Sequence, residues 1–327
     1  MSGRRLLPRA AFLLSLWTAV LAAQTPPFHS ESSVVLVPVT VTDNRGEFVT
    51  GLKATDFLLT DNGAPRKVQM DSADSGEASI SLAVLIESSE ISFAALTKVE
   101  QIADALSHLV VGPGGSVAIA TFDQGIVWRQ DFTSEPVALA GALKQIPTGA
   151  GKTARMLDAL MEASRHLDQR QGRRVVFLIS ESRDRGSKTN LKTAVQQVQR
   201  EGILVYSARF SPYFTPFTVK QGQVAPPGRE DQEAQPNYLP AFGEIGRFAK
   251  SSMLHTLAAA TGGEEFAFLQ QQSLEDDVSK LGKELHYQDV LSFTPDEDVP
   301  GLHHLEIKVR REGRYHVRAR QAYWFGK

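Results

Sequence analysis

The chain has 327 residues, of which 42% are hydrophobic and 22% charged, the balance of an ordinary soluble globular protein of about two domains. Its 35 lysines and arginines nearly cancel its 37 aspartates and glutamates, so the formal net charge is −2 and no nucleic-acid partner is indicated. The absence of cysteine excludes disulfides, zinc–cysteine sites and thiol catalysis.

Residues 1–23 have the pattern of a secretory signal peptide. Arg4, Arg5 and Arg9 precede the apolar run AAFLLSLWTAVLAA, which ends in small residues. The run is shorter than the ~20 residues that a membrane span needs, although a retained N-terminal anchor helix is the alternative. We therefore expect an exported protein, periplasmic or extracellular, with no transmembrane span in its mature chain.

The mature chain is expected to begin and end with short β-strands. The N-terminal segment, residues 29–76, and the C-terminal segment, residues 287–327, both contain β-branched or alternating runs separated by turn residues. The expected strands are residues 33–42, 47–52, 56–60, 66–70, 289–295, 302–311 and 315–325. Neither segment can bury a core alone, so we predict that the two pair in a small β-sandwich-like module.

Residues 78–286, between these segments, have a different rhythm. Continuous apolar runs, typical of strands covered on both faces, alternate with runs that have helical spacing. The expected strands are residues 80–86, 116–122, 173–180, 203–210 and 264–269, and the expected helices are 93–111, 135–146, 153–169, 189–202, 253–263 and 273–286. This alternation predicts an α/β domain with a doubly wound, mostly parallel sheet. The proline-rich residues 211–247 are expected to form a long surface loop inserted into that domain.

Three long blocks of sequence carry a resemblance to a known family. They are FHSESSVVLVPVTVTDNRGEFVTGLKATDFLLTDNGAPRKV near the start, LHTLAAATGGEEF, and LHHLEIKVRREGRYHVRARQAYW near the end. In these blocks the chain resembles the acidobacterial family of secreted VWFA-related proteins. The resemblance implies a bacterial, Rossmann-like von Willebrand factor type A domain inserted between the two β segments, and a role in protein binding, adhesion or scaffolding without catalysis.

The resemblance also implies a metal-ion-dependent adhesion site at the carboxyl ends of the strands. The matching positions are Glu87, Ser89, Thr153 and Glu181. Glutamate stands at both positions where the family has aspartate, and Ile91 stands where it has a second serine. Because Mg²⁺ demands nearly octahedral oxygen ligands at ~2.0–2.1 Å, these changes favour a degenerate site. A divalent cation, Mg²⁺ or Ca²⁺, is the only cofactor that we consider for it.

The predicted partner is another protein, bound at the rim of this site. Glu90, Ile91 and Asp184 are the rim residues expected beside the site. An aromatic cluster leads into the proline-rich loop and adds the rim candidates Tyr213, Phe214 and Phe217. Packing of the base of that loop is the alternative explanation for these aromatic residues. A purely structural envelope or matrix protein with a dead site is the alternative for the chain.

Two patterns support an enzyme as the alternative function. The segment IPTGAGKT, residues 146–153, resembles a phosphate-binding loop, but Ile146 occupies the leading glycine position and a helical pattern precedes the loop. Glu87 and Glu181 could form a paired-carboxylate acid/base site. A hydrolase or nucleotide-dependent enzyme that uses the GAGKT loop or this glutamate pair is therefore kept as the alternative. Histidines 303, 304 and 316 are interpreted as surface residues of alternating strands.

Overall fold

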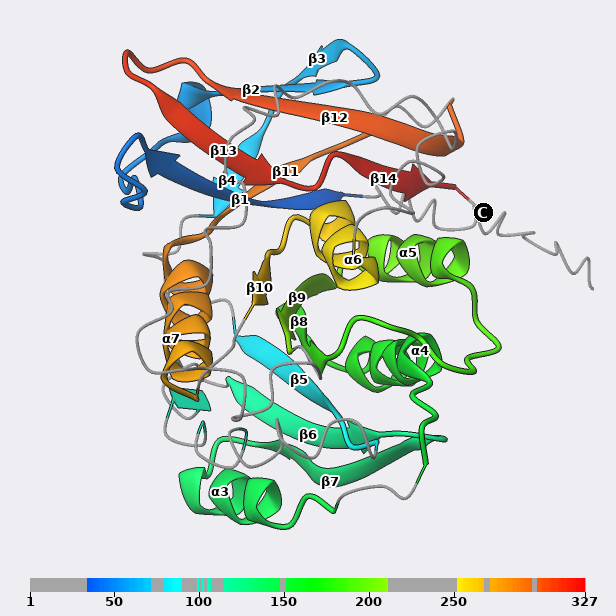
Figure 1. The fold of residues 1–327 in the computed structure, drawn as a ribbon. Coiled ribbons are helices and arrows are strands. Elements are labelled where there is room, and N and C mark those ends of the chain that lie inside the picture. Colours follow the sequence, from blue (N-terminus) through cyan, green and yellow to red (C-terminus); the bar gives the residue numbers. More distant parts are fainter. Residues whose placement is uncertain are drawn as a thin grey trace, which may run out of the picture. The chain divides into compact units, whose positions relative to one another are not determined.

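A six-stranded sheet forms the centre of the α/β part of the chain (Figure 1). The computed structural model describes residues 34–71, 79–89, 99, 102, 105–106, 115–147, 151–210, 252–267, 271–295 and 299–326. The strands of this sheet are β5 (Ile80–Glu87), β6 (Ser116–Phe122), β7 (Ile126–Thr133), β8 (Arg173–Ser180), β9 (Leu204–Arg209) and β10 (Glu265–Ala267). Their order is β10-β9-β8-β5-β6-β7, and only β7 is antiparallel to its neighbour. Counted from β5 this is the order 3-2-1-4-5-6 of doubly wound sheets, which confirms the predicted fold class.

Helices cover both faces of the sheet, as Figure 1 shows for α7 on one side and α4, α5 and α6 on the other. The helices are α3 (Pro136–Lys144), α4 (Met156–Asp168), α5 (Leu191–Arg200), α6 (Met253–Thr261) and α7 (Gln271–Tyr287). Alternate residues of β5 enter two cores: Leu82, Val84 and Ile86 pack with α3 and α7, whereas Ala83 and Leu85 pack with α4, α5 and α6. The continuous apolar run of β5 follows from this double burial.

The terminal segments form two four-stranded antiparallel sheets, as predicted. Their strands are β1 (Val35–Asp43), β2 (Phe57–Asp61), β3 (Ala64–Arg66), β4 (Gln69–Asp71), β11 (Asp289–Phe293), β12 (Gly301–Val309), β13 (Tyr315–Ala319) and β14 (Ala322–Phe325), with a 3₁₀ turn η1 (Ala54–Asp56). The orders are β13-β1-β11-β4 and β14-β12-β2-β3, so each sheet joins N-terminal and C-terminal strands. One apolar core, which includes Val37, Leu59 and Leu291, lies between them.

Several elements differ from those expected. The expected strands 66–70 and 315–325 are each divided between the two terminal sheets, as β3 and β4 and as β13 and β14. The strand expected at residues 47–52 is wrong: in that segment only Phe48 forms a bridge, to Thr42. Strand β7 was not expected, because IVWRQDFT carries polar residues along an edge strand that pairs with β6 alone. Edge strands are incompletely buried, so they lack the apolar run that reveals a central strand.

Several predictions fall outside the described residues. They concern the signal peptide at 1–23, most of the expected helix at 93–111, and the proline-rich loop at 211–247. Among the helices of the described residues, none combines the length and the apolar character that a bilayer crossing requires.

Candidate functional site

The candidate site lies where the sheet changes its direction of winding. Strands β5 and β8 are parallel neighbours, with Ile86 opposite Ile179, so both end at the same edge of the sheet. The chain continues from β5 to β6 on one side and reaches β8 on the other. Open α/β sheets bind ligands at such a switch point, beyond the carboxyl ends of the strands. The last residue of β5 is Glu87, and Glu181 directly follows β8.

The Glu87 carboxylate is completely buried, and both of its oxygens accept two hydrogen bonds. Its Oε1 atom accepts from the Ser89 hydroxyl at 2.7 Å and from the Arg185 guanidinium at 2.5 Å. Its Oε2 atom accepts from the Ser180 hydroxyl at 2.8 Å and from the backbone N–H of Glu181 at 3.0 Å. A carboxylate has about four acceptor positions, so the hydrogen-bonding capacity of Glu87 is filled by the protein itself.

Arg185 supplies the positive charge of this cluster. Its Nη1 atom donates to Glu181 at 2.7 Å, and its Nη2 atom donates both to Glu87 and, at 3.2 Å, to the hydroxyl of Ser89. Burial alone would lower the pKa of the guanidinium, but the hydrogen bond that it donates to Glu181 and the charges of Glu87 and Glu181 outweigh burial and raise that pKa. The three side chains form one ionic cluster, with exposed fractions of 0% for Glu87, 7% for Glu181 and 21% for Arg185.

The backbone holds Arg185 in place. Residues Ala154 and Arg185 form an antiparallel bridge, with N–H to carbonyl distances of 3.1 and 2.8 Å. The Arg185 Nε atom also donates to the carbonyl of Lys152. The next residue, Gly186, has a φ of +106°, a conformation that other residues rarely adopt. The loop after β8 is thereby fixed against the segment that carries Thr153.

Thr153 and Asp184 lie next to this cluster. The methyl carbon of Thr153 would be 3.4 Å from a β-carbon added at Gly186, so the threonine packs against the loop after β8. The carboxylate of Asp184 accepts from the backbone N–H of Leu157 at 3.0 Å and from the Ser187 hydroxyl at 2.6 Å. Asp184 therefore caps the first turn of α4. Its predicted contact with a partner stays a prediction.

The structure brings together Glu87, Ser89 and Glu181, and Thr153 lies on the segment that is bridged to the loop of Arg185. Five rim residues lie outside the described residues: Glu90, Ile91, Tyr213, Phe214 and Phe217. Positions 148–150, which include the start of the GAGKT loop, lie outside them as well. Arg185 was not among the predicted site residues. The clue in the sequence was that this arginine lies four residues after Glu181. Two carboxylates gathered at one edge of a sheet require a cation nearby.

The residues present do not fit a divalent cation. The oxygens of Glu87 that would ligate a metal ion already accept four hydrogen bonds, one of them from a guanidinium. Among the described residues, no group of three or more histidines, aspartates or glutamates has a metal-binding arrangement. The same geometry counts against the glutamate pair as an acid/base site, because Glu87 is inaccessible to a substrate.

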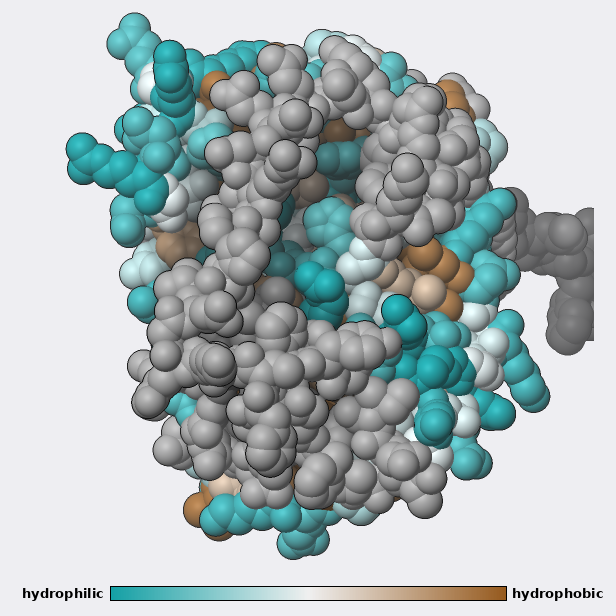
Figure 2. Space-filling view, in the orientation of Figure 1, coloured by the Kyte–Doolittle hydropathy of each residue, from teal (hydrophilic) through white to brown (hydrophobic). Residues whose placement is uncertain are grey.

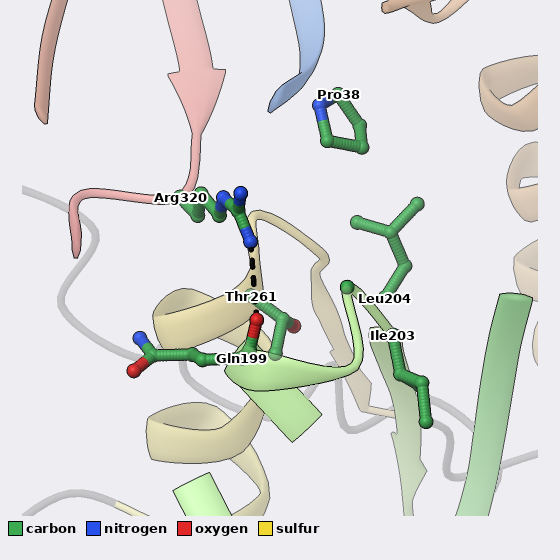
Figure 3. A pocket seen from close by; sticks show the side chains of 7 residues that line it. Pro38, Gln199, Ile203, Leu204, Thr261 and Arg320 are labelled. Carbon is green, nitrogen blue, oxygen red and sulfur yellow. Dashed lines mark hydrogen bonds between the residues drawn. The ribbon is translucent and has the colours of Figure 1, made fainter. Parts of the chain in front are cut away.

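A second feature, a hollow between β1, β9 and the turn before β14, contains no ligand-sized space (Figure 3). It is lined by Pro38, Ile203, Leu204 and Thr261, among others. The space inside it is too small for a water molecule. Figure 3 shows the buried Arg320 guanidinium pointing to the carbonyl of Gln199, to which it donates at 3.3 Å. Burial lowers the pKa of Arg320 to about 10. The hollow is a packing seam rather than a binding site.

Several solved structures are distantly similar to the chain. A von Willebrand factor type A structure from Catenulispora acidiphila is 10% identical with a TM-score of 0.46, over 91% of this chain and 75% of that chain. The vWF domain of the type V pili tip protein Mfa5 from Porphyromonas gingivalis is 7% identical with a TM-score of 0.43, over 64% of this chain and 95% of that chain. An aerotolerance-related membrane protein from Bacteroides fragilis is 13% identical with a TM-score of 0.42, over 63% of this chain and 99% of that chain.

Structural similarities with such low identities and TM-scores do not indicate a function. The fold class is assigned from the strand order and the strand pairing of the six-stranded sheet. No protein-family description matches the sequence, and no curated protein is significantly similar to it.

Proposed function

We propose that the chain is an exported, non-enzymatic binding or scaffold protein of the VWFA-related family. Its type A domain engages another protein at the carboxyl edge of the six-stranded sheet. The observation that carries this proposal is the fixed loop at the switch point, residues 181–188, which Arg185 and Asp184 tie to β5 and α4. A loop that is ordered before binding loses little conformational entropy when a partner docks.

The charges exposed around this loop indicate the chemistry of the partner. Lys152, Arg183 and Lys188 are exposed, and all three are basic. The nearby carboxylates of Glu87 and Glu181 are buried or nearly so and are held by Arg185. Described residues over α4, which begins beside the loop, are mainly hydrophilic in Figure 2. The edge therefore favours an acidic, polar surface of a partner protein.

A charge-reversal capture experiment tests the proposal. The mature chain is immobilised and exposed to an extract of the source cell envelope and culture fluid, and bound proteins are identified by mass spectrometry. We expect the substitutions Lys152→Glu, Arg183→Glu and Lys188→Glu, made together, to abolish capture of a partner that the wild type retains at low salt. Surface charges act mainly on association and are screened by salt, so capture should also weaken as the salt concentration rises.

The matched control carries three reversals elsewhere. Arg45→Glu, Lys53→Glu and Lys308→Glu change the net charge equally, and all three residues are exposed in the terminal β-sheet module. This variant should capture the partner as the wild type does. Equal loss in both variants, or retention in both, would show that the carboxyl edge of the sheet is not the binding surface.

The enzyme alternative has its own test. If the GAGKT loop held a nucleotide, ATP or GTP with Mg²⁺ would stabilise the native chain by mass action. We expect no change of Tm with either nucleotide at millimolar concentration. A shift that Lys152→Ala abolishes would favour the nucleotide-dependent enzyme instead.

A further inference from the structure

The buried carboxylates at the sheet edge need a positive charge. Glu87 is 0% exposed, and the side chain of Glu181 is 7% exposed. Ionised carboxylates in such positions are strongly unfavourable unless a cation and hydrogen-bond donors compensate them. The guanidinium of Arg185 meets both carboxylates, at 2.5 and 2.7 Å, so the compensating cation belongs to the chain itself.

The geometry suits a guanidinium better than a metal ion. The two terminal nitrogens of Arg185 reach different carboxylates, and one of them also reaches the hydroxyl of Ser89. The planar donor fork thereby lets one cation bridge two carboxylates through charge-assisted hydrogen bonds. A divalent cation on the same oxygen of Glu87 would lie against the guanidinium and be repelled by it.

The position of the guanidinium is fixed from the backbone side as well. The two hydrogen bonds between Ala154 and Arg185 and the bond from Nε to the carbonyl of Lys152 hold the residue from both ends. The guanidinium could leave the cluster only by losing the bond to the carbonyl of Lys152 together with those to Glu87, Glu181 and Ser89. A dissolved cation therefore competes with an intramolecular group that has already been ordered.

We propose that Arg185 is a resident cation that takes the place of the divalent metal at this site, so that the native chain neither binds nor requires Mg²⁺, Mn²⁺ or Ca²⁺ there. The site resembles a metal centre in its carboxylates and hydroxyls but is closed by a side chain. The replacement of the metal ion by Arg185 depends on the chain alone, and it holds whatever partner the edge of the sheet binds.

Metal titration of the mature wild-type chain is the first part of the test. Isothermal titration calorimetry with MnCl₂, MgCl₂ and CaCl₂ should give no binding heat, and the Tm should be the same with each cation and with EDTA. Saturable heat from one of these cations that Glu87→Gln removes, or a Tm that EDTA lowers, would overturn the proposal.

Substitution of the arginine is the second part. Arg185→Ala leaves two carboxylates without their cation and should lower the Tm by about 10 °C, as expected for breaking a buried ion pair in a protein of this size. The matched control is Arg183→Ala, which removes the same charge from a 70% exposed side chain 3.9 Å from Glu181 and should leave the Tm nearly unchanged. Equal Tm values for the two variants would contradict the proposal.

Rescue separates a resident cation from an ordinary packing residue. Guanidinium chloride at tens of millimolar, or MnCl₂, should restore part of the Tm lost in Arg185→Ala and should not raise that of the wild type or of Arg183→Ala. A loss that neither cation reduces would overturn the proposal. If Arg185→Ala does not fold, Arg185→Lys keeps the charge but lacks the planar fork, and its Tm should lie below that of the wild type.

Discussion

Two clusters of glutamate and arginine in this molecule show how similar groups serve different tasks. In the site cluster, Glu87 meets Arg185 at 2.5 Å, and the partners come from the ends of β5 and β8 and the loop that follows β8. In the second, here called the junction cluster, Glu284 of α7 meets Arg318 of β13, also at 2.5 Å. Both glutamates are 0% exposed.

The partners of Glu284 come from distant parts of the chain. Thr40 of β1 donates to it at 3.1 Å and Tyr206 of β9 at 2.5 Å. Burial, followed by the charge of Glu284, raises the pKa of Tyr206 well above its usual value, so this phenol remains a neutral donor. The junction cluster thus ties a terminal β-sheet to the α/β domain, whereas the site cluster ties loops of one sheet edge together. The junction cluster therefore supports the whole fold, and the site cluster supports a local surface.

The largest effect is expected from breaking the junction cluster. Glu284→Ala leaves Arg318 and the hydroxyls of Thr40 and Tyr206 without their shared acceptor, which should lower the free energy of unfolding by about 3 kcal/mol. Urea denaturation followed by circular dichroism measures this. Glu306→Ala is the control, because Glu306 pairs with the exposed Lys308 at 2.7 Å and is itself 49% exposed. If the two variants were equally stable, the junction cluster would not support the fold.

A buried histidine inside the terminal β-module should have the next largest effect. The prediction that His303 is a surface residue is wrong, because its side chain is 1% exposed. Its Nδ1 atom lies 2.7 Å from Asp61, and its Nε2 atom contacts the carbonyl of Val299. Tyr323 also donates to Asp61, at 3.0 Å. Residue 303 points inward because adjacent residues of β12 alternate between the two faces of the sheet.

Replacing each of the two adjacent histidines separates these faces. His303→Ala should cost about 2–3 kcal/mol, because it removes a buried ring and leaves the carboxylate of Asp61 without one partner. His304→Ala should cost less than about 0.5 kcal/mol, as substitutions at partly exposed sites usually do. Urea denaturation of both variants measures the difference, and comparable losses would mean that His303 contributes no more than a surface residue.

An uncompensated acid on α7 contrasts with the paired Glu284 of the same helix. Burial raises the pKa of Asp277 to about 6; the charge of Lys280 lowers it, and those of Asp276 and Glu264 raise it. Among the described residues, no hydrogen-bond donor reaches its buried Oδ2 atom. Between pH ~4 and ~6 the folded state therefore binds more protons than the unfolded state, so stability should fall as the pH rises through this window.

Asp277→Asn should remove this pH dependence. At pH 7 the variant should be more stable than the wild type by about 1–2 kcal/mol, a value reduced to allow for the partial exposure of the carboxylate. Urea denaturation at pH values from 4 to 7 measures the difference. A wild-type stability that rises steadily between pH 4 and 6, with no gain in Asp277→Asn, would contradict the assignment.

The smallest stability effect is expected at the proposed binding surface itself. Arg183→Glu changes an exposed side chain and should shift the free energy of unfolding by less than about 0.5 kcal/mol. Partner capture should nevertheless fall, since rim charges act on association rather than on folding. Urea denaturation of the same preparation used for capture measures both quantities. A large loss of stability would mean that Arg183 belongs to the site cluster and not to the binding surface.

Much of the fold could be predicted because burial on two faces leaves a visible pattern. The apolar runs of β5 and β8 and the alternation of β12 follow directly from their places in the sheets. The edge strand β7 could not be found in this way, since its partly exposed residues have no such pattern. The inward position of His303 was equally hidden, because alternation reveals two faces but not which of them is buried.

The site was predictable only in part. The ends of β5 and β8 placed Glu87 and Glu181 at one edge of the sheet, which follows from parallel pairing. The role of Arg185 depends on a loop with positive φ angles at Ser182 and Gly186 and on the bridge to Ala154, and none of these is encoded in a periodic pattern. Side chains that reach a site from a loop are set by tertiary contacts, which a single sequence does not display.

The most direct test of the central claim is a crystal structure of the mature chain grown with MnCl₂ and measured at the manganese absorption edge. The account predicts no anomalous density beside Glu87 and Glu181, and clear density for the Arg185 guanidinium between the two carboxylates. An anomalous peak on the Glu87 oxygens, with the arginine turned away, would contradict it.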